Sequence, residues 1–163
     1  MAAVNENLYT FPAGILPKDA CIVIVHTEWN AAIVDKLLEG CLEILRQNGI
    51  AEYKVIRVPG AFEIPFAVKN MWEACRNTFK KPQAFITLGC VLRGDTPHFD
   101  YVCKAVTEGV LQLNLTLPVP TIFGILTVDN QLQADERTGG IHGHKGKEAA
   151  ITALKMLSLN YSM

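Results

Sequence analysis

One stretch of the chain, residues 89–101, carries the side chains and backbone groups best suited to chemistry. It reads GCVLRGDTPHFDY and follows an apolar run, Ala84–Leu88, that predicts a buried strand. Thr96 suits the N-cap and Pro97 the first position of a helix that follows. Free backbone N–H groups at the start of a helix attract anions, phosphate in particular. With the imidazole of His98 in the first turn, the segment predicts chemistry on a phosphorylated small molecule.

The elements around this segment alternate between short apolar strands and longer helical stretches. The expected strands are Ala20–Val25, Tyr53–Val58, Ala84–Leu88 and Thr121–Leu126. Helices are expected from Asn30 to Gly49, from about Pro65 with Phe79 in register, after Pro97, briefly at Asp129, and from about Lys145. This order predicts a three-layer αβα sandwich around a four-stranded parallel sheet, with right-handed crossovers and a flavodoxin-like strand order.

Composition and charge narrow the function classes. The chain has 163 residues, is half hydrophobic and carries a net charge of −1, which predicts one compact domain and disfavours nucleic acid and membrane surfaces as partners. Residues 20–163 are expected to form a single catalytic α/β domain, and residues 1–19 an N-terminal arm. No signal peptide is expected, and the five cysteines lack a C-x-x-C pair. These features predict reduced cysteines and a cytoplasmic location.

Ligands of open parallel sheets bind outside the carboxyl ends of the strands. The segments to examine are therefore those just after each expected strand: residues 26–30 (HTEWN), 59–63 (PGAFE), 89–98 and 127–129. They bring together aromatic, carboxylate, histidine and glycine residues. That combination suits the binding of a polar ring compound and a phosphate.

Three long motifs in these segments resemble the 6,7-dimethyl-8-ribityllumazine synthase family. They are VPGAFEIP at 58–65, GCVLRGDTPHFDYV at 89–102, and FGILT at 123–127 with ERTG at 136–139 and HKG at 144–146. The resemblance covers about residues 20–160, in the family's order. It implies the condensation of 5-amino-6-(D-ribitylamino)uracil with 3,4-dihydroxy-2-butanone 4-phosphate, the penultimate step of riboflavin biosynthesis. It implies no cofactor and no metal.

The resemblance also assigns the proton and phosphate chemistry. His98 matches the proton-transfer residue, and a helix start favours its neutral form; the alternative is a histidine that only caps or hydrogen-bonds the loop. Arg137 matches a phosphate-binding arginine that reaches across from a neighbouring subunit; alone, it would pair with Glu136 or Asp135. The phosphate loop corresponds to Gly94, Asp95 and Thr96, with the Asp95 carboxylate turned away. For Arg93, phosphate binding and a structural ion pair are both open alternatives.

The remaining matched positions would hold the pyrimidine and its ribityl chain. Trp29 would stack on the ring, and Gly60, Ala61 and Glu63 match the ribityl-binding segment. Cys90, Val91 and Leu92 would offer backbone groups to the ring edge, with Cys90 a lining residue and not a nucleophile. Phe123 matches an aromatic donated by the adjacent subunit, and Lys145 a lysine near the ring carbonyl. Ordinary alternatives are core packing for Trp29 and Phe123, helix-dipole stabilisation for Glu63 and an exposed charge for Lys145.

The resemblance implies assembly as well. Family members form pentamers, some of which build 60-subunit icosahedral capsids, and the arm at 1–19 resembles a segment that adds an edge strand to the next subunit's sheet. Riboflavin synthase is an expected partner. Within the loop between Arg137 and Lys145, Ile141, His142 and His144 depart from the family pattern. Because His-x-His has no third ligand beside it, it is weak evidence for a metal.

Two other functions remain open at this point, and a third, suggested by topology alone, fails. A non-catalytic lumazine or flavin carrier on the same fold would keep Trp29 and the ribityl segment but lose the phosphate and proton groups. In a shell or storage protein, assembly would be the main function, and catalytic turnover would matter less. A flavodoxin-like or receiver domain would need a hydroxyl-rich or acidic loop after the first strand, where this chain has HTEWN.

Overall fold

A four-stranded parallel sheet organises the computed structural model, which describes residues 20–159. The strands are β1 (Ile22–Thr27), β2 (Tyr53–Val58), β3 (Ala84–Leu92) and β4 (Thr121–Val128), and they lie in the order β2-β1-β3-β4. All three neighbouring pairs are parallel. The fold class and the flavodoxin-like strand order expected from the sequence are confirmed. The arm expected at residues 1–19 lies outside the described residues.

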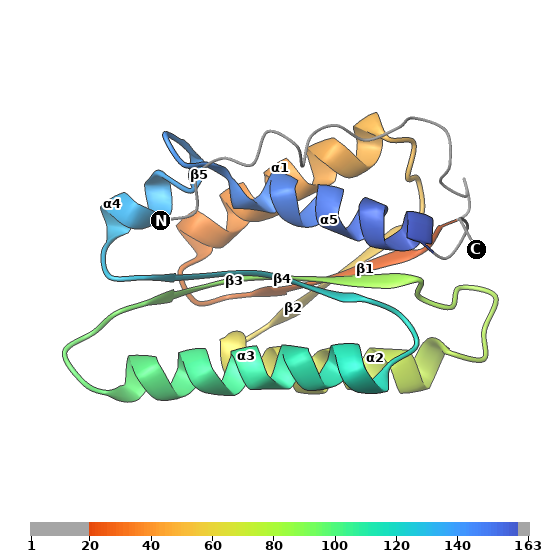
Figure 1. The fold of residues 1–163 in the computed structure, drawn as a ribbon, viewed down its shortest axis with the longest axis horizontal. Helices are drawn as coiled ribbons and strands as arrows, with labels where there is room; N and C mark the ends of the chain where they lie inside the picture. Colours follow the sequence, from red (N-terminus) through yellow and green to blue (C-terminus); the bar gives the residue numbers. More distant parts are fainter. Residues whose placement is uncertain (1–19, 160–163) are drawn as a thin grey trace.

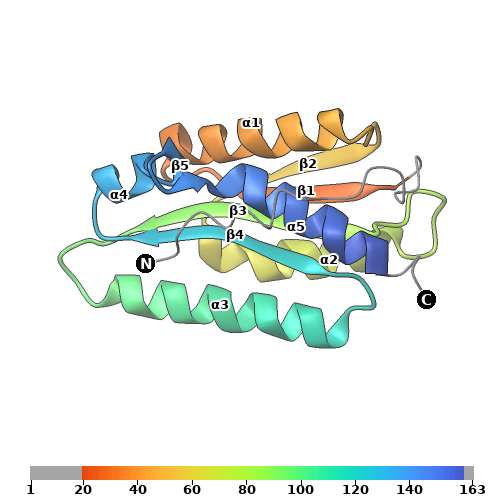
Figure 2. The same ribbon diagram turned by 45° about the horizontal axis from the view of Figure 1, so that its top comes forward.

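Helices cover both faces of the sheet, which gives three layers (Figure 1). One face carries α1 (Ala31–Gln47) and α5 (Lys145–Leu159), and the other carries α2 (Ile64–Cys75) and α3 (His98–Thr116). Helix α1 packs on β1 and β3, and α5 packs on β3 and β4, as the turned view helps to show (Figure 2). The central strand β1 is buried along its whole length because alternate side chains enter the two cores.

The short elements gather near the carboxyl ends of the strands. A single turn of 3-10 helix, η2 (Ala61–Glu63), leads into α2, and α4 (Gln131–Asp135) follows β4. A two-stranded hairpin, β5 (Thr138–Gly140) and β6 (Gly143–His144), then connects α4 to α5. The sequence did not predict this hairpin, because its strands are shorter than any hydrophobic period can reveal. Both Gly139 and Gly143 adopt positive φ values within it.

Strands β3 and β4 extend beyond the ends that the sequence predicted, Leu88 and Leu126. Gly89 was read as the end of a strand, but it lies inside β3. A Cβ at this position would lie 3.2 Å from the Thr27 methyl group of β1, so the glycine allows close packing between neighbouring strands. As a result, the sheet carries the motif of residues 89–92 to its carboxyl edge as regular strand.

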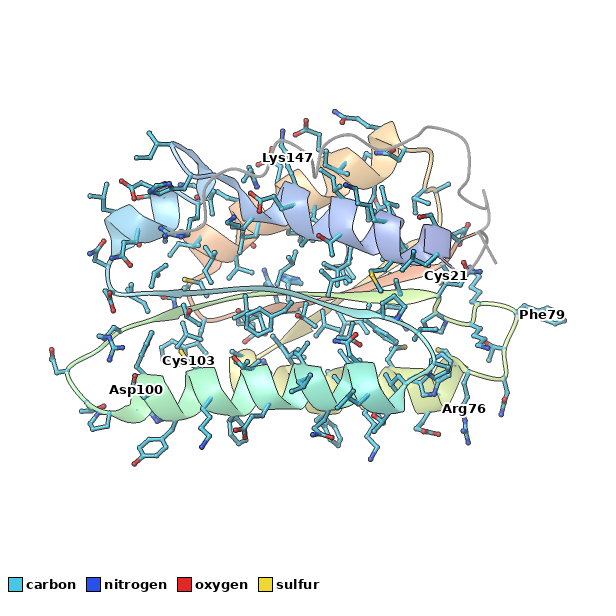
Figure 3. All side chains as sticks on the ribbon, viewed as in Figure 1. Cys21, Arg76, Phe79, Asp100, Cys103 and Lys147 are labelled. Atoms are coloured by element: carbon cyan, nitrogen blue, oxygen red, sulfur yellow. The ribbon has the colours of Figure 1, made fainter. Side chains whose placement is uncertain are left out.

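Helix α2 ends earlier than predicted, and the expected core position of Phe79 is wrong. The helix stops at Cys75, and Phe79 is fully exposed at a relative accessibility of 112%. Both the backbone N–H and the hydroxyl of Thr78 bind the Cys75 carbonyl, at 3.0 and 2.9 Å. This local bonding competes with continuation of the helix. Figure 3 shows Phe79 pointing outward beyond Arg76.

No helix among residues 20–159 is both long and apolar enough to cross a membrane. The five cysteines are all free thiols.

Candidate active site

The loop between β1 and α1 places Trp29 at the carboxyl edge of the sheet. The backbone N–H groups of Glu28 and Trp29 donate to the carbonyls of Val58 and Pro59, at 2.9 and 3.1 Å. Trp29 is 72% exposed, so core packing does not explain it. An indole held open to solvent by two backbone hydrogen bonds is suited to stack on a planar ligand.

Asn30 holds this loop against the centre of the sheet. Its backbone is left-handed, with φ 59° and ψ 41°, a conformation that asparagine tolerates better than most residues. Its side-chain Nδ2 donates to the carbonyl of Cys90 on β3 at 2.9 Å. The sequence predicted a helix cap here, and the residue is at the N-cap position, but its side chain makes no cap hydrogen bond. The side chain instead fixes the distance between Trp29 and β3.

Gly60 brings the predicted ring-binding and ribityl-binding groups together. A Cβ on Gly60 would lie 3.1 Å from Glu63 Oε2 and 3.4 Å from Trp29 Cδ1. The carboxylate oxygen and the indole edge therefore both lie beside this glycine. Glu63 is at the start of α2, as the helix-dipole alternative expects, but its oxygen also faces this shared space. Ala61 is buried beneath it.

The end of β3 forms the floor between these groups and the phosphate loop. Cys90 is buried, at 4% exposure, and burial raises the pKa of its thiol to about 11. A thiol with such a pKa stays protonated at neutral pH and is a poor nucleophile. Cys90 therefore suits the role of a lining residue. Its carbonyl already accepts from Asn30, and Val91 and Leu92 pair with Thr127 and Val128 of β4, so the ring-edge role of these backbone groups stays a prediction.

Residues 94–96 form an exposed loop that leads to His98. The helix start differs by one or two residues from the prediction: α3 begins at His98 with Pro97 at the N-cap position, and Thr96 lies outside it. A residue before proline is disfavoured in the helical region, which explains the position of Thr96. Within the described chain the Thr96 hydroxyl and the His98 imidazole make no hydrogen bond, so His98 is not a loop-bonding histidine. Both side chains remain free for a ligand.

Arg93 belongs to the scaffold of this loop, which settles the alternative that the sequence left open. Its guanidinium contacts Asp129 at 2.8 Å and Asp100 at 3.1 Å, and it lies 4.0 Å from the centre of the Phe99 ring. The hydrogen bonds that Arg93 donates to Asp129 and Asp100 hold its pKa above the usual range. Asp100 is labelled at the start of α3 in Figure 3. Arg93 thus ties both ends of the phosphate loop and makes a structural ion pair.

A second group of predicted residues lies along the free edge of β4. A groove of 610 Å³ runs between this strand and α5, and its lining includes Phe123, Arg137 and Lys145. Phe123 is 41% exposed, so it is not a core residue. Arg137 donates to the Gln133 carbonyl at 3.0 Å. The two carboxylates expected to pair with it are engaged elsewhere, Asp135 with Lys36 and Glu136 with His142.

Lys145 is anchored by a carboxylate that the sequence analysis missed. Its Nζ lies 2.7 Å from Glu148 Oε2, and both side chains are largely buried, at 21% and 14% exposure. The other oxygen of Glu148 is buried without a hydrogen-bond partner among the described residues. Lys145 is therefore not a freely exposed charge. The i,i+3 spacing of lysine and glutamate at a helix start is a signal that could have revealed the pair.

The two groups of residues do not meet within one chain. Phe123 pairs with Thr87 of β3, five residues before the strand ends at Leu92. At about 3.3 Å per residue, this places Phe123 roughly 16 Å before the end of β3, and β3 lies between Phe123 on β4 and the strand β1 that leads to Trp29. The chain therefore presents two half-sites: a carboxyl-edge half-site with Trp29, Gly60, Glu63 and His98, and a β4-edge half-site with Phe123, Arg137 and Lys145.

Possible metal ligands form no cluster in the part of the chain that the structure describes. No group of three or more histidine, cysteine, aspartate or glutamate side chains is placed to hold an ion there. His142 instead lies 3.7 Å from Glu136.

An open parallel sheet that gathers an aromatic ring, a carboxylate and a free histidine at its carboxyl edge defines the class: an α/β enzyme acting on a small polar molecule. Comparison with known proteins makes the class specific. The family model of 6,7-dimethyl-8-ribityllumazine synthase matches residues 19–161. The chain belongs to this family, and it is an enzyme of the transferase class, as the sequence predicted.

Proteins similar to this chain carry the same description. One from Parabacteroides distasonis is 44% identical over 98% of this chain and 99% of its own length. Those from Porphyromonas gingivalis and Cytophaga hutchinsonii are each 45% identical, over 98% and 97% of this chain and 98% of their own lengths. All three are named 6,7-dimethyl-8-ribityllumazine synthase. The similarity extends over the whole catalytic fold and includes both half-sites.

Proposed function

We propose that the chain condenses 5-amino-6-(D-ribitylamino)uracil with 3,4-dihydroxy-2-butanone 4-phosphate to give 6,7-dimethyl-8-ribityllumazine, phosphate and water. Its membership of the family supports this reaction. The structural observation that carries it is the space beside Gly60, where an exposed indole and a carboxylate oxygen lie close together. A flat pyrimidine with a polyhydroxyl chain needs just this pair: a surface to stack on and an acceptor for hydroxyl groups.

The proposed roles follow the chemistry of the two substrates. The pyrimidine stacks on Trp29, and Glu63 accepts hydrogen bonds from the ribityl hydroxyls. Backbone N–H groups of residues 94–96 and the hydroxyl of Thr96 hold the phosphate of the second substrate. The 5-amino group attacks the ketone and loses water to form a Schiff base. Phosphate is then eliminated to leave an enol that tautomerises to a ketone, and the ribitylamino nitrogen attacks this ketone and loses a second water to close the second ring.

His98 is proposed to move the protons of these steps. Its free imidazole lies next to the phosphate loop, where it can take a proton from the carbon chain as phosphate leaves. Little further covalent chemistry is needed, because the substrate diamine is itself the nucleophile. Holding two substrates in a reactive arrangement can lower the barrier by several kcal/mol, about 7–11 in favourable cases. Positioning is therefore the main contribution proposed for the protein.

The proposed active site is completed by a second copy of the chain. The β4-edge half-site would supply Phe123 over the ring and Arg137 to the phosphate of a neighbour, since a guanidinium binds two phosphate oxygens at once. The separation of the two half-sites supports this arrangement, and so do exposed aromatic residues beside the carboxyl-edge half-site, Phe62 at 64% and Phe66 at 75%. A homopentamer, with a 60-subunit capsid as its higher assembly, is the proposed form.

Two further expectations keep the status of predictions. Riboflavin synthase is the proposed partner that consumes the product. The cytoplasm is the proposed location, in keeping with five unpaired thiols.

The experiment mixes the purified protein with both substrates and follows the absorbance and fluorescence of the lumazine against the uncatalysed reaction. We expect a clear acceleration that falls in His98→Ala and in Arg137→Ala. Absence of acceleration, with tight binding of the lumazine, would replace the enzyme by the carrier. The presence of Thr96, His98 and Arg137 in the half-sites favours the enzyme over that alternative.

A further inference from the structure

The β5–β6 hairpin meets helix α1 at a notch created by a glycine. A Cβ on Gly40 would lie 2.6 Å from His144 Nε2 and 2.7 Å from Nδ1, closer than any real Cβ contact. The imidazole ring therefore lies directly on the backbone of α1, and only glycine leaves room for it. The next contact is equally close, because a Cβ on Gly146 would overlap the Leu37 carbonyl of the same helix.

The hairpin that His144 holds connects the two cationic groups of the β4-edge half-site. Residue 144 pairs with Thr138 across the hairpin. The backbone N–H of Lys145 donates to the Arg137 carbonyl at 2.8 Å, and that of His142 donates to the Glu136 carbonyl at 2.9 Å. Arg137 and Lys145 thus lie at the two ends of this hairpin. The hairpin contacts α1 through the imidazole ring of His144.

We infer that His144 is a positioning residue, whose ring in the Gly40 notch holds Arg137 and Lys145 in the geometry that the neighbouring subunit's phosphate-bearing substrate requires. The inference rests on the proposed function of those two residues. It assigns a role to a residue that departs from the family pattern. Because His144 contacts α1 and not the ligand, its effect acts entirely through the hairpin.

The charges around the ring make this anchor sensitive to pH. Glu39 and Glu43 face it from α1 and Lys147 faces it from α5, while β5 contributes no titratable group. Burial, together with Lys147, lowers the pKa of His144 against the opposing effect of the two glutamates. The ring is therefore neutral in the folded protein near pH 7. Acidification below the ordinary histidine value of about 6.5 favours release of the ring, since protonation is easier outside the notch.

Three substitutions separate the packing of the ring from its charge. Gly40→Ala fills the notch and displaces the ring, and His144→Ala removes the ring. His144→Phe keeps a planar ring that takes no proton, and it also loses the long hydrogen bond, 3.5 Å, that Nδ1 accepts from the Lys147 backbone N–H. Glu43→Gln is the control at neutral pH: it breaks the ion pair between Glu43 and Lys147 at 2.8 Å and removes a carboxylate that raises the pKa of His144, so the ring stays neutral and in the notch. Figure 3 labels Lys147 on the side of α5 nearest α1.

Two readouts are measured on the full-length protein. We expect the KM for the butanone phosphate to rise roughly tenfold or more in Gly40→Ala and His144→Ala, since small displacements of positioning groups have large effects. The KM for the aminouracil should change little, and His144→Phe and Glu43→Gln should stay near the wild-type value. The KM of the wild type for the butanone phosphate should rise below about pH 6.5, and this rise should be absent in His144→Phe.

Hydrogen exchange of the Lys145 and His142 amides reports the anchoring independently of turnover. These amides should exchange faster in Gly40→Ala and His144→Ala than in the wild type and the control. Unchanged exchange would overturn the anchoring role. Faster exchange with an unchanged KM for the phosphate would show a purely structural contact and overturn the positioning role. A wild type without turnover would overturn the proposed function instead, and exchange would then decide the anchoring alone.

Discussion

Asn30 offers the sharpest test of how the loop that carries Trp29 is held. Asn30→Ala removes the hydrogen bond from Nδ2 to the Cys90 carbonyl and places alanine in a left-handed backbone conformation. The lost hydrogen bond is worth about 0.5–1.5 kcal/mol, and the left-handed conformation costs an alanine about 1–2 kcal/mol. Together they should lower the free energy of unfolding by about 2–3 kcal/mol.

The matched variant is Asn30→Gly, which loses the same hydrogen bond but adopts a positive φ without steric cost. It should lose only about 1 kcal/mol from the hydrogen bond, plus a few tenths through the entropy of the unfolded chain. Urea unfolding at one fixed protein concentration measures both variants, since subunit association contributes to stability. Equal losses in the two variants would refute the assignment of strain to residue 30.

The same pair of variants tests the functional part of the reasoning. Release of the loop from β3 should weaken the stacking of Trp29, which is worth about 0.5–1.5 kcal/mol. The KM for the aminouracil should therefore rise by roughly 3- to 10-fold in both variants. An unchanged KM in both would show that the hydrogen bond to Cys90 does not position the indole.

Three other predictions follow from the buried groups of the structure. Cys90→Ala should leave turnover within about tenfold of the wild type, because a thiol with a pKa of about 11 is not ionised. Loss of a true nucleophile costs about a thousandfold or more, and iodoacetamide should likewise fail to inactivate the wild type through this residue. Glu148→Gln should lower the free energy of unfolding by about 1–3 kcal/mol through the lost charged hydrogen bond to Lys145, whereas Lys104→Met, which breaks an exposed pair, should cost about 0–1 kcal/mol in the same urea titration. Burial lowers the pKa of His26, so its contribution to stability is complete above about pH 6.5 and is lost as the pH falls toward the folded-state value; urea titrations at pH 5.5 and 7.5 should show a smaller decrease for His26→Gln than for the wild type, and an equal decrease would contradict the role of this histidine.

The sequence predicted the sheet well because its signals are local and strong. The run from Ile22 to Val25 is apolar on both faces, as a central parallel strand must be, and Gly49 ends its helix with a positive φ. The errors arose where a nonlocal contact overrides a local preference. The predicted strand stops at Leu88, but β3 continues through Gly89, which leaves room for the side chain of Thr27 from the next strand. Asn30 is at the N-cap position as predicted, but its amide reaches β3 and makes no cap hydrogen bond.

The candidate site divides in a similar way. The family resemblance named the residues of both proposed half-sites, but it does not reveal which of them can meet inside one chain. That separation follows from the pairing of Phe123 with Thr87, far from the carboxyl edge. The supporting residues were also beyond reach, since Glu148 and the contact of Gly40 with His144 depend on how α5 packs on α1. Sequence motifs recorded the groups proposed to touch ligands, whereas the structure was needed to find what holds them.

The central claim is that one active site is built from two subunits, and mixed oligomers test it most directly. His98→Ala damages the carboxyl-edge half-site, and Arg137→Ala damages the β4-edge half-site. Each variant alone should be nearly inactive. When the two are co-expressed with different tags and purified as mixed oligomers, random assembly in a closed ring leaves about a quarter of the sites with both halves intact. Recovery of lumazine formation to about that fraction of the wild-type rate is the predicted result, and mixed oligomers no more active than the separate variants would contradict the shared site.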